Sequence, residues 1–437
     1  NLSTIIVVDE NPYFTSEDGI VYNKDKTELW LYPAKREVYE FAVPDTIKTI
    51  KEGAFWQASI TFLNLNEGLT TFEQGWSFHG LKKMNVPSTI KTIAPIDVES
   101  NPLPETVEFI GSSASVIISS DNFTWYKNGW YWGSENNPYF ALVGRRYLNA
   151  NIEVHPQTEI IADGVGAAVF VDYGETFVIP DSVRIVCGKL FSGGGVDNIE
   201  IGKNAYFYDE NPFSGMVWIE EFSVDPENPY YTTDDKGVLY SKDFKTLICY
   251  PGASEYTSYT INEQCEEIAM GAFAATDFNH LMLQELTIPE SVVKIGDDAF
   301  EGIFFKNEGL TDVYYKGDLS GWAEIDFGTN LSNPMAYVEN LYINNVLMEG
   351  DIVIPEGTEK IEGYAFYNCT RLTGITIPKS ITSIGEYAFY NCTGLTAITM
   401  PNSVTYIGEY AFYNCTGAKS ITISDSITNI HEYTFYN

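Results

Sequence analysis

The chain has 437 residues, of which 44% are hydrophobic, and a formal net charge of −35. This apolar content excludes a disordered chain, and the negative charge makes nucleic acid a poor partner because its phosphates are repelled. No apolar run approaches the ~18 residues that a membrane helix needs, so we expect no membrane-spanning segment.

A hairpin module lies near the start of the chain and returns in its second half. Val8–Pro33 (VDENPYFTSEDGIVYNKDKTELWLYP) and Val224–Pro251 (VDPENPYYTTDDKGVLYSKDFKTLICYP) both contain an Asn-Pro turn, followed by two strand-like runs joined by a charged Lys-Asp turn. This pattern predicts a β-hairpin in each segment. Asn11 and Asn228 are 217 residues apart, which indicates that the two halves are diverged duplicates.

Phenylalanines at a regular interval follow the first hairpin. Phe55 and Phe78 are 23 residues apart, and Pro44-Asp45-Thr46-Ile47 before them marks a strand-ending turn. A period in the low twenties predicts one short unit stacked on copies of itself, which is a leucine-rich-repeat solenoid. We assign no repeat within Thr92–Ser120. The phenylalanine position recurs with more divergence at Phe170, Phe191, Phe213, Phe273 and Phe300.

An insertion at 113–154 contains the most aromatic stretch of the chain, Trp125–Gly133 (WYKNGWYWG). Its Asn128-Gly129 pair predicts a hairpin turn. Exposed aromatic faces suit stacking on sugar rings or gripping a peptide. We therefore select these candidate binding residues: Trp125, Tyr126, Trp130 and Trp132.

The alternative is that this hairpin lies on the solenoid and buries one face where a repeat is missing. Aromatic residues are ordinary strand formers, so their presence alone does not require a ligand. Strand alternation puts Trp130 and Trp132 on one face and Tyr131 on the other. Only one of those faces can be free.

The repeat becomes regular after a second insertion, 316–350, which ends in a hairpin predicted around Asn344-Asn345. In the rung Leu395–Gly417, the first residues predict a short strand, and Val404 with Ile407 a second extended segment. Glu409–Phe412 is predicted as one helical turn. The regular phenylalanines, 23 residues apart, are Phe366, Phe389, Phe412 and Phe435.

Other residues also recur at this spacing. Cys369, Cys392 and Cys415 share one position, and we predict a ladder of buried thiols that form no disulfides. A stripe of tyrosine is typical of an adhesive surface, but stacked identical rings also hold rungs together, and both interpretations stay open. The two tyrosine columns are Tyr364, Tyr387, Tyr410 and Tyr433, and Tyr367, Tyr390, Tyr413 and Tyr436.

The runs Ile377–Cys392 (IPKSITSIGEYAFYNC), Met400–Cys415 (MPNSVTYIGEYAFYNC) and Gly237–Pro251 (GVLYSKDFKTLICYP), together with Asn340–Pro355, resemble BspA-like leucine-rich-repeat surface proteins of host-associated bacteria. The resemblance implies export, surface display and adhesion, in some members to host matrix proteins such as fibronectin and fibrinogen. It supplies no catalytic residues.

The residues themselves give little support to catalysis. The four histidines lie far apart in sequence, and no pair has metal-ligand spacing. No G-x-S-x-G or P-loop motif is present. We therefore expect no enzymatic activity, no cofactor and no metal site. The histidines are His79, His155, His280 and His431.

We predict a right-handed leucine-rich-repeat solenoid of β-rich α/β class, on the cell surface or secreted, that binds or adheres to host or neighbouring-cell proteins without catalysis. One alternative is a carbohydrate-binding surface protein that uses the tryptophan-rich hairpin, and another is a passive spacer. Asn1 is not an initiator Met, and we expect the chain to be part of a longer protein. The predicted segments are a hairpin with rungs (1–112), the aromatic insertion (113–154), divergent rungs (155–315) with a hairpin module at 224–251, an insertion (316–350) and regular repeats (351–437).

Overall fold

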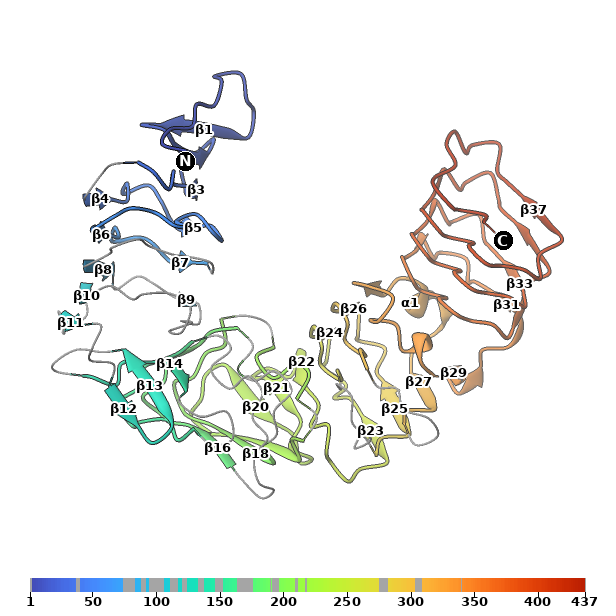
Figure 1. Ribbon diagram of the computed structural model, residues 1–437. Helices are drawn as coiled ribbons and strands as arrows, with labels where there is room; N and C mark the ends of the chain where they lie inside the picture. The colour runs from blue at the N-terminus through green and yellow to red at the C-terminus, as the bar shows by residue number, and fades with distance from the viewer. Residues whose placement is uncertain are drawn as a thin grey trace. The chain divides into compact units, whose positions relative to one another are not determined.

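The structure is a computed structural model that describes residues 2–36, 40–73, 83–87, 92–93, 106–110, 117–119, 124–132, 137–145, 152–162, 176–188, 190, 196–208, 211–216, 218–274, 282–302, 309–338 and 340–436. The chain divides into two compact units, Asn1–Gly194 with Glu200–Pro212, and Gly195–Ile199 with Phe213–Asn437. Each unit is a β-solenoid of short parallel strands, as predicted, and each is described below by itself (Figure 1).

Unit 1 contains three larger sheets. The first has the strand order β1 (Phe14–Glu17), β2 (Ile20–Asn23), β3 (Glu28–Leu31), β5 (Thr49–Ile50), β7 (Thr71–Phe72) and β9 (Thr92–Ile93). The second has the order β11 (Ile117–Ser119), β10 (Thr106–Ile110), β8 (Lys83–Pro87), β6 (Phe62–Asn64) and β4 (Glu40–Ala42). The third has the order β12 (Thr124–Tyr126), β13 (Gly129–Trp132), β14 (Ala141–Arg145), β15 (Ile160–Ile161) and β17 (Ile185–Val186). Two further strands are β16 (Thr176–Ile179) and β18 (Asn198–Ile201).

Unit 2 contains the strand β19 (Glu221–Val224) and four sheets. The first sheet has the strand order β20 (Tyr231–Thr233), β21 (Leu239–Ser241), β22 (Thr246–Cys249), β24 (Glu267–Ile268), β26 (Lys294–Ile295) and β28 (Asp326–Phe327). The second has the order β23 (Ser258–Thr260), β25 (Glu285–Ile288), β27 (Asp312–Tyr315), β29 (Asn340–Ile343) and β30 (Val346–Leu347). The third sheet has the order β31 (Gly350–Val353), β33 (Leu372–Thr376), β35 (Ala397–Thr399) and β37 (Ser420–Thr422). The fourth has the order β32 (Lys360–Ile361), β34 (Ser383–Ile384) and β36 (Tyr406–Ile407).

The helices are short. Helix α1 spans Leu319–Ala323 and the 3-10 helix η1 spans Pro334–Ala336. Within the described ranges, neither these nor any other helix has the length and apolar character needed to cross a membrane.

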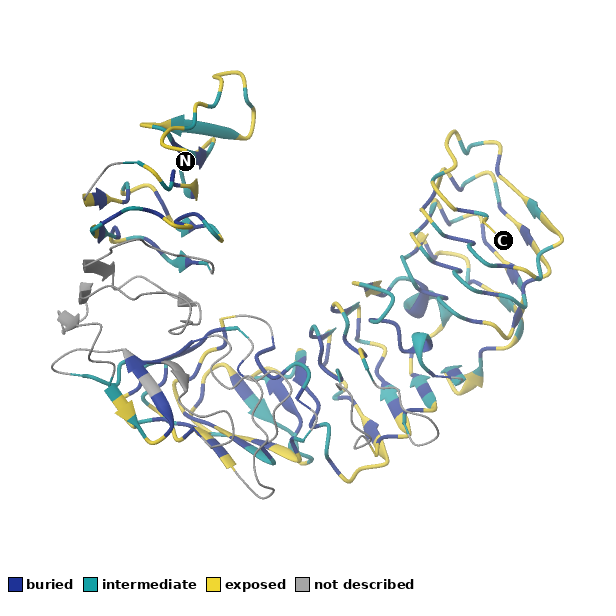
Figure 2. Ribbon diagram, in the orientation of Figure 1, coloured by how far each residue is buried: buried dark blue, intermediate teal, exposed yellow. Residues whose placement is uncertain are grey.

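Adjacent rungs pair in parallel with identical side chains in register. Across β33, β35 and β37 the backbone pairs Ile375 with Ile398 and Ile398 with Ile421. The threonines that follow these isoleucines, Thr376, Thr399 and Thr422, pair beside them in the same way. The isoleucine at the centre of β35 is buried, whereas its threonine neighbour is exposed. Strand alternation therefore gives each sheet an inner apolar face and an outer polar one, and burial follows that division along the stack (Figure 2).

The predicted helical turn in each regular rung is wrong. In the run Glu409–Phe412, Tyr410 has a φ of 56°, which is left-handed backbone that an α-helix cannot contain. The chain turns instead through successive hydrogen-bonded turns, with Ala411 N–H donating to Gly408 O and Tyr413 N–H donating to Tyr410 O. The same positive φ occurs in the other rungs at Tyr364, Tyr387 and Tyr433.

The hairpin modules are confirmed, and each has three antiparallel strands rather than two. The strands are β1-β2-β3 in unit 1 and β20-β21-β22 in unit 2, and each set continues into parallel rungs. The side chains of Asn11 and Asn228 both accept two backbone N–H groups from the residues that follow their Asn-Pro turns. This correspondence agrees with the interpretation that the two halves are duplicates.

The aromatic insertion proves to be a third copy of this module. Strands β12, β13 and β14 are antiparallel, and β14 then pairs in parallel with β15. All three modules have a register irregularity between the same two positions of their middle strand. The residue after that irregularity is a buried tyrosine in every copy: Tyr22, Tyr131 and Tyr240.

The turn of this third hairpin differs from the predicted one. Tyr126 pairs with Gly129, so the two-residue loop is Lys127-Asn128, and Lys127 has a φ of 52°. Gly129 is needed for a different reason, because a Cβ there would lie 2.7 Å from the ring of Tyr131. The glycine thus allows close packing of the buried tyrosine.

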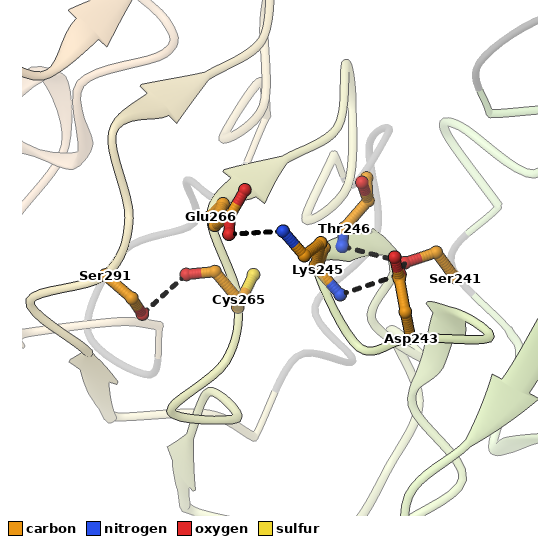
Figure 3. A network of polar contacts seen from close by, with 7 residues as sticks. All are labelled: Ser241, Asp243, Lys245, Thr246, Cys265, Glu266 and Ser291. Carbon is orange, nitrogen blue, oxygen red and sulfur yellow. Dashed lines mark hydrogen bonds and ion pairs between the residues drawn. The ribbon is translucent and has the colours of Figure 1, made fainter.

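A polar network joins the module of unit 2 to its first parallel rung (Figure 3). The Ser241 hydroxyl donates to the Asp243 carboxylate at 2.8 Å, and Lys245 Nζ lies 2.7 Å from the Glu266 carboxylate. Ser291 on the next rung donates to Cys265 O at 2.7 Å. These contacts fix the hairpin turn to the rungs that follow it.

The phenylalanine column of unit 2 is interrupted at the 316–350 insertion. Phe273 and Phe300 stack at 5.1 Å, and Phe300 N–H donates to Leu331 O, which makes Ser332 the residue at the next phenylalanine position. Ser332 is fully buried. Trp322 of α1 fills the core nearby and donates its indole N–H to Ala365 O at 2.8 Å.

Candidate binding surfaces

The aromatic hairpin presents one face inward and one outward. Tyr131 is fully buried; its hydroxyl donates to Glu153 O and accepts from His155 N–H, both at 3.1 Å. Trp125 pairs with Trp130 across β12 and β13, and 38% of its surface is exposed. For Trp130 and Trp132 the structure describes the backbone alone, so the predicted orientation of their side chains stays a prediction.

Tyr126 belongs to a compact cluster under the hairpin. Its hydroxyl donates to the Glu153 carboxylate at 2.7 Å, and its ring meets the His155 ring edge-on at 4.7 Å. His155 stacks on Tyr139 with centroids 3.6 Å apart. The hydrogen bond to Glu153 raises the pKa of Tyr126, and burial lowers the pKa of His155. Tyr126 is therefore held by the fold, and only its remaining surface is offered to a ligand.

The two tyrosine columns form a continuous surface on the regular rungs. Neighbouring rings within each column lie nearly parallel, with centroids 4.7 to 5.3 Å apart. The two columns also touch, since Tyr387 and Tyr390 are 5.6 Å apart, as are Tyr410 and Tyr413. The rings are half-buried on the inner rungs, and Tyr433 and Tyr436 are 44% and 57% exposed. The rings therefore stack on one another while part of each column remains on the surface, and the adhesive role of that surface stays a prediction.

Because the rings stack, their faces are covered by neighbouring rings, and the tyrosines of the inner rungs stay half-buried. Burial raises the pKa of Tyr364 to about 12, and the carboxylate of Glu386 contributes to that rise. Burial also raises the pKa of Tyr410, with further contributions from Tyr433, Glu432 and Glu409. A row of glutamate carboxylates, one from each rung, thus lies beside the first tyrosine column.

Two further ladders lie beside the tyrosines. The Asn391 side-chain amide donates to Asn368 Oδ1 at 2.5 Å, and that of Asn414 donates to Asn391 Oδ1 at 2.6 Å. The thiols are buried as predicted, and Cys392 Sγ donates to Phe366 O at 3.1 Å. Burial raises the pKa of the Cys369 and Cys415 thiols to about 12.

A buried polar chain in unit 2 was not predicted from the sequence. The hydroxyls of Tyr240 and Tyr259 lie 2.6 Å apart, and Tyr259 donates to the Asp234 carboxylate at 2.6 Å. Asn262 N–H also donates to the Tyr240 hydroxyl. The asparagine ladder, by contrast, could have been found from its 23-residue spacing, since identical amides one rung apart can bond each other.

A cavity of about 440 Å³ lies where η1 meets the first regular rung. Its walls include the buried side chains of Met335, Val338 and Met348, with Asn368 and Arg371 among its polar members. Its lining is a mixture of apolar and polar side chains.

The histidines do not come together into a site. His155 stacks on Tyr139, and His431 lies 5.2 Å from Tyr406; His79 and His280 fall outside the described residues. In the part of the chain that the structure describes, no three His, Cys, Asp or Glu residues are grouped so that they could hold a metal ion.

Comparison with known proteins places these features in a family. A family model described as the BspA type leucine rich repeat region matches residues 34–114, 170–303 and 341–437, in 6 copies. No curated protein matches the chain.

Several solved structures align with most of this chain. A leucine-rich repeat protein from Eubacterium ventriosum ATCC 27560 is 19% identical with a TM-score of 0.46, over 96% of this chain and 95% of that one. A leucine rich cell surface protein from Faecalibacterium prausnitzii A2-165 is 20% identical with a TM-score of 0.38, over 97% and 100%. The pneumococcal vaccine antigen PcpA is 16% identical with a TM-score of 0.36, over 96% and 78%.

The matched segments cover more than half of the chain and include the rungs with the tyrosine and asparagine ladders. The hairpin modules around β1 and β13 lie outside them, whereas the module around β20 lies within residues 170–303. The resemblance drawn from the repeat sequences is therefore confirmed, and the chain belongs to the family of BspA type leucine-rich-repeat proteins.

Proposed function

We propose that this chain is a non-enzymatic binding or adhesion protein, on the bacterial cell surface or secreted, that recognises host or neighbouring-cell proteins through its solenoid surface. The observation that supports this proposal most directly is the double tyrosine column on the regular rungs. Tyrosine is enriched at protein interfaces because it offers a large, rigid contact area with a polar tip. Eight such side chains stand here in two adjoining rows.

The test is binding of the purified chain to immobilised host matrix proteins, including fibronectin and fibrinogen, measured by biolayer interferometry. The decisive variant is Tyr390→Ala/Tyr413→Ala, which removes two neighbouring half-buried rings from one column. A matched control is Tyr206→Ala/Tyr208→Ala, two exposed tyrosines of unit 1. Loss of binding in the first variant and retention in the second is the expected result.

A second candidate function, glycan binding, rests on Trp125, whose ring is partly exposed at the edge of the third hairpin. Tyr126, Trp130 and Trp132 would complete that site. A glycan array with the chain and its Trp125→Ala variant separates this function from protein binding. Binding to no matrix protein and no glycan would instead favour a passive spacer.

A further inference from the structure

The tyrosine columns have polar groups that the fold leaves unused. Among the described residues, no hydrogen bond engages the hydroxyls of Tyr387, Tyr390, Tyr410 and Tyr413. The ring faces, in contrast, are covered by neighbouring rings. This surface therefore offers a partner two rows of hydroxyls rather than open aromatic faces. Within each row, successive hydroxyls are about 5 Å apart along the solenoid axis.

Three carboxylates run beside the first column. Glu386, Glu409 and Glu432 are exposed, each stands one residue before a column tyrosine, and within the described ranges none forms an ion pair. Glu362, one rung earlier, is instead paired with Lys360. The chain as a whole carries a net charge of −35, and this row of unpaired carboxylates is complementary to a basic partner.

We propose that these tyrosines and glutamates bind a basic segment of a partner protein in the polyproline II conformation, lying along the solenoid axis. Such a segment leaves its backbone carbonyls unpaired, so tyrosine hydroxyls can donate to them. An α-helix satisfies its own carbonyls and would leave the hydroxyl rows without partners.

The spacing supports this geometry. Three polyproline II residues advance about 9.3 Å, and two solenoid rungs advance about 9.6 Å, so every third residue meets equivalent groups. Arg or Lys at every third position would face the carboxylate row, where arginine can form two parallel hydrogen bonds. An extended β-strand repeats every ~6.6 Å and would drift out of phase within one rung.

This inference rests on the proposed protein-binding function and identifies the chemistry of its partner. The test uses the full chain and a fluorescent (Pro-Pro-Arg) repeat peptide long enough to span the four regular rungs, with binding followed by anisotropy. A (Gly-Ser-Arg) repeat of equal charge and length controls for charge alone. The (Pro-Pro-Arg) peptide should bind at least about tenfold more tightly, because it is already ordered.

The variant Glu386→Gln/Glu432→Gln, whose two positions lie two rungs apart, should weaken binding about tenfold, since two ion pairs of up to about 1 kcal/mol each are lost. Glu356→Gln/Asp425→Asn makes the same charge change on exposed residues outside this row and should alter affinity less than about twofold. Tyr387→Phe/Tyr410→Phe keeps the rings stacked, removes two hydroxyls, and should weaken binding measurably.

Equal binding of both peptides, or an equal effect of both charge variants, would overturn the inference and leave only attraction by net charge. If the chain binds matrix proteins but not the (Pro-Pro-Arg) peptide, this inference fails while the proposed function stands. If it binds neither peptides nor matrix proteins, both fail. Binding only to glycans gives the tyrosine surface no role and also refutes the inference.

Discussion

Replacement of Asn391 tests whether the side-chain ladder stabilises the regular rungs. Asn391 donates to Asn368 and accepts from Asn414, and its φ is 59°. In Asn391→Ala both side-chain hydrogen bonds are lost, at about 0.5–1.5 kcal/mol each. Alanine in left-handed backbone costs about 1–2 kcal/mol more. We therefore expect a local destabilisation of about 2–5 kcal/mol.

Asn391→Gly separates the two contributions. Glycine loses the same hydrogen bonds but adopts positive φ freely, and it pays about 0.4–1 kcal/mol for its greater freedom in the unfolded chain. The glycine variant should therefore be about 0.5–1 kcal/mol more stable than the alanine variant, which reverses the usual order. Asn402→Ala, at an exposed asparagine with ordinary φ, is the matched control and should change stability by less than about 0.5 kcal/mol.

The assay is native-state hydrogen exchange, resolved by mass spectrometry on peptides that cover the rungs around Asn391. Local exchange is preferable to a single melting temperature because the chain has two compact units and each rung contacts its neighbours. If alanine is more stable than glycine here, the backbone argument is wrong. If neither variant changes exchange in these rungs, the amide ladder contributes nothing to stability.

Three other outcomes are expected. Tyr240→Phe should lower the free energy of unfolding of unit 2 by about 1.5–3 kcal/mol in denaturant unfolding, because the buried Tyr259 hydroxyl and Asn262 N–H lose their partner. Tyr22→Phe should change stability by less than about 0.5 kcal/mol, since no described residue forms a hydrogen bond with its hydroxyl. The Cys392 thiol, whose pKa burial raises, should react with a thiol reagent only after denaturation, and rapid native reaction would contradict the ladder. The free energy of unfolding should stay constant below pH 10 and fall between pH 10 and pH 12, because a tyrosine in the unfolded chain ionises near pH 10 whereas the pKa of Tyr364 in the folded chain is about 12. A free energy of unfolding that does not fall over this interval would contradict the prediction.

The repeat period was enough to predict the stacked architecture, but not the conformation within each rung. The spacing of Phe366 and its successors requires equivalent positions one rung apart, which only a solenoid supplies. Glu409–Phe412 has the composition of a helical turn, and the prediction failed because Tyr410 adopts positive φ. That conformation is uncommon for a bulky residue and is maintained by contacts with the rungs on both sides.

Structure was also missed where residues diverged. No repeat was assigned in Thr92–Ser120, yet β10 pairs in parallel with β8 and continues the stack. The relation of the third hairpin to the other two modules was not predicted because its Asn137-Pro138 turn lies between β13 and β14, whereas the Asn-Pro turns of the other modules precede their first strands. Backbone pairing shows the relation, since the same irregularity precedes Tyr131, Tyr22 and Tyr240.

The near-identity of the last rungs has a physical reason that bears on function. Each Tyr, Phe and Asn of a ladder contacts a copy of itself in the adjacent rung, so a change in one inner rung disrupts contacts on two sides. Where the column is broken, as at Ser332, a new side chain, Trp322, supplies the missing volume and a hydrogen bond. Regular ladders therefore repeat the same surface groups every rung as a consequence of packing. A partner with a matching repeat can then bind in several registers, and its affinity should grow with the number of rungs it spans.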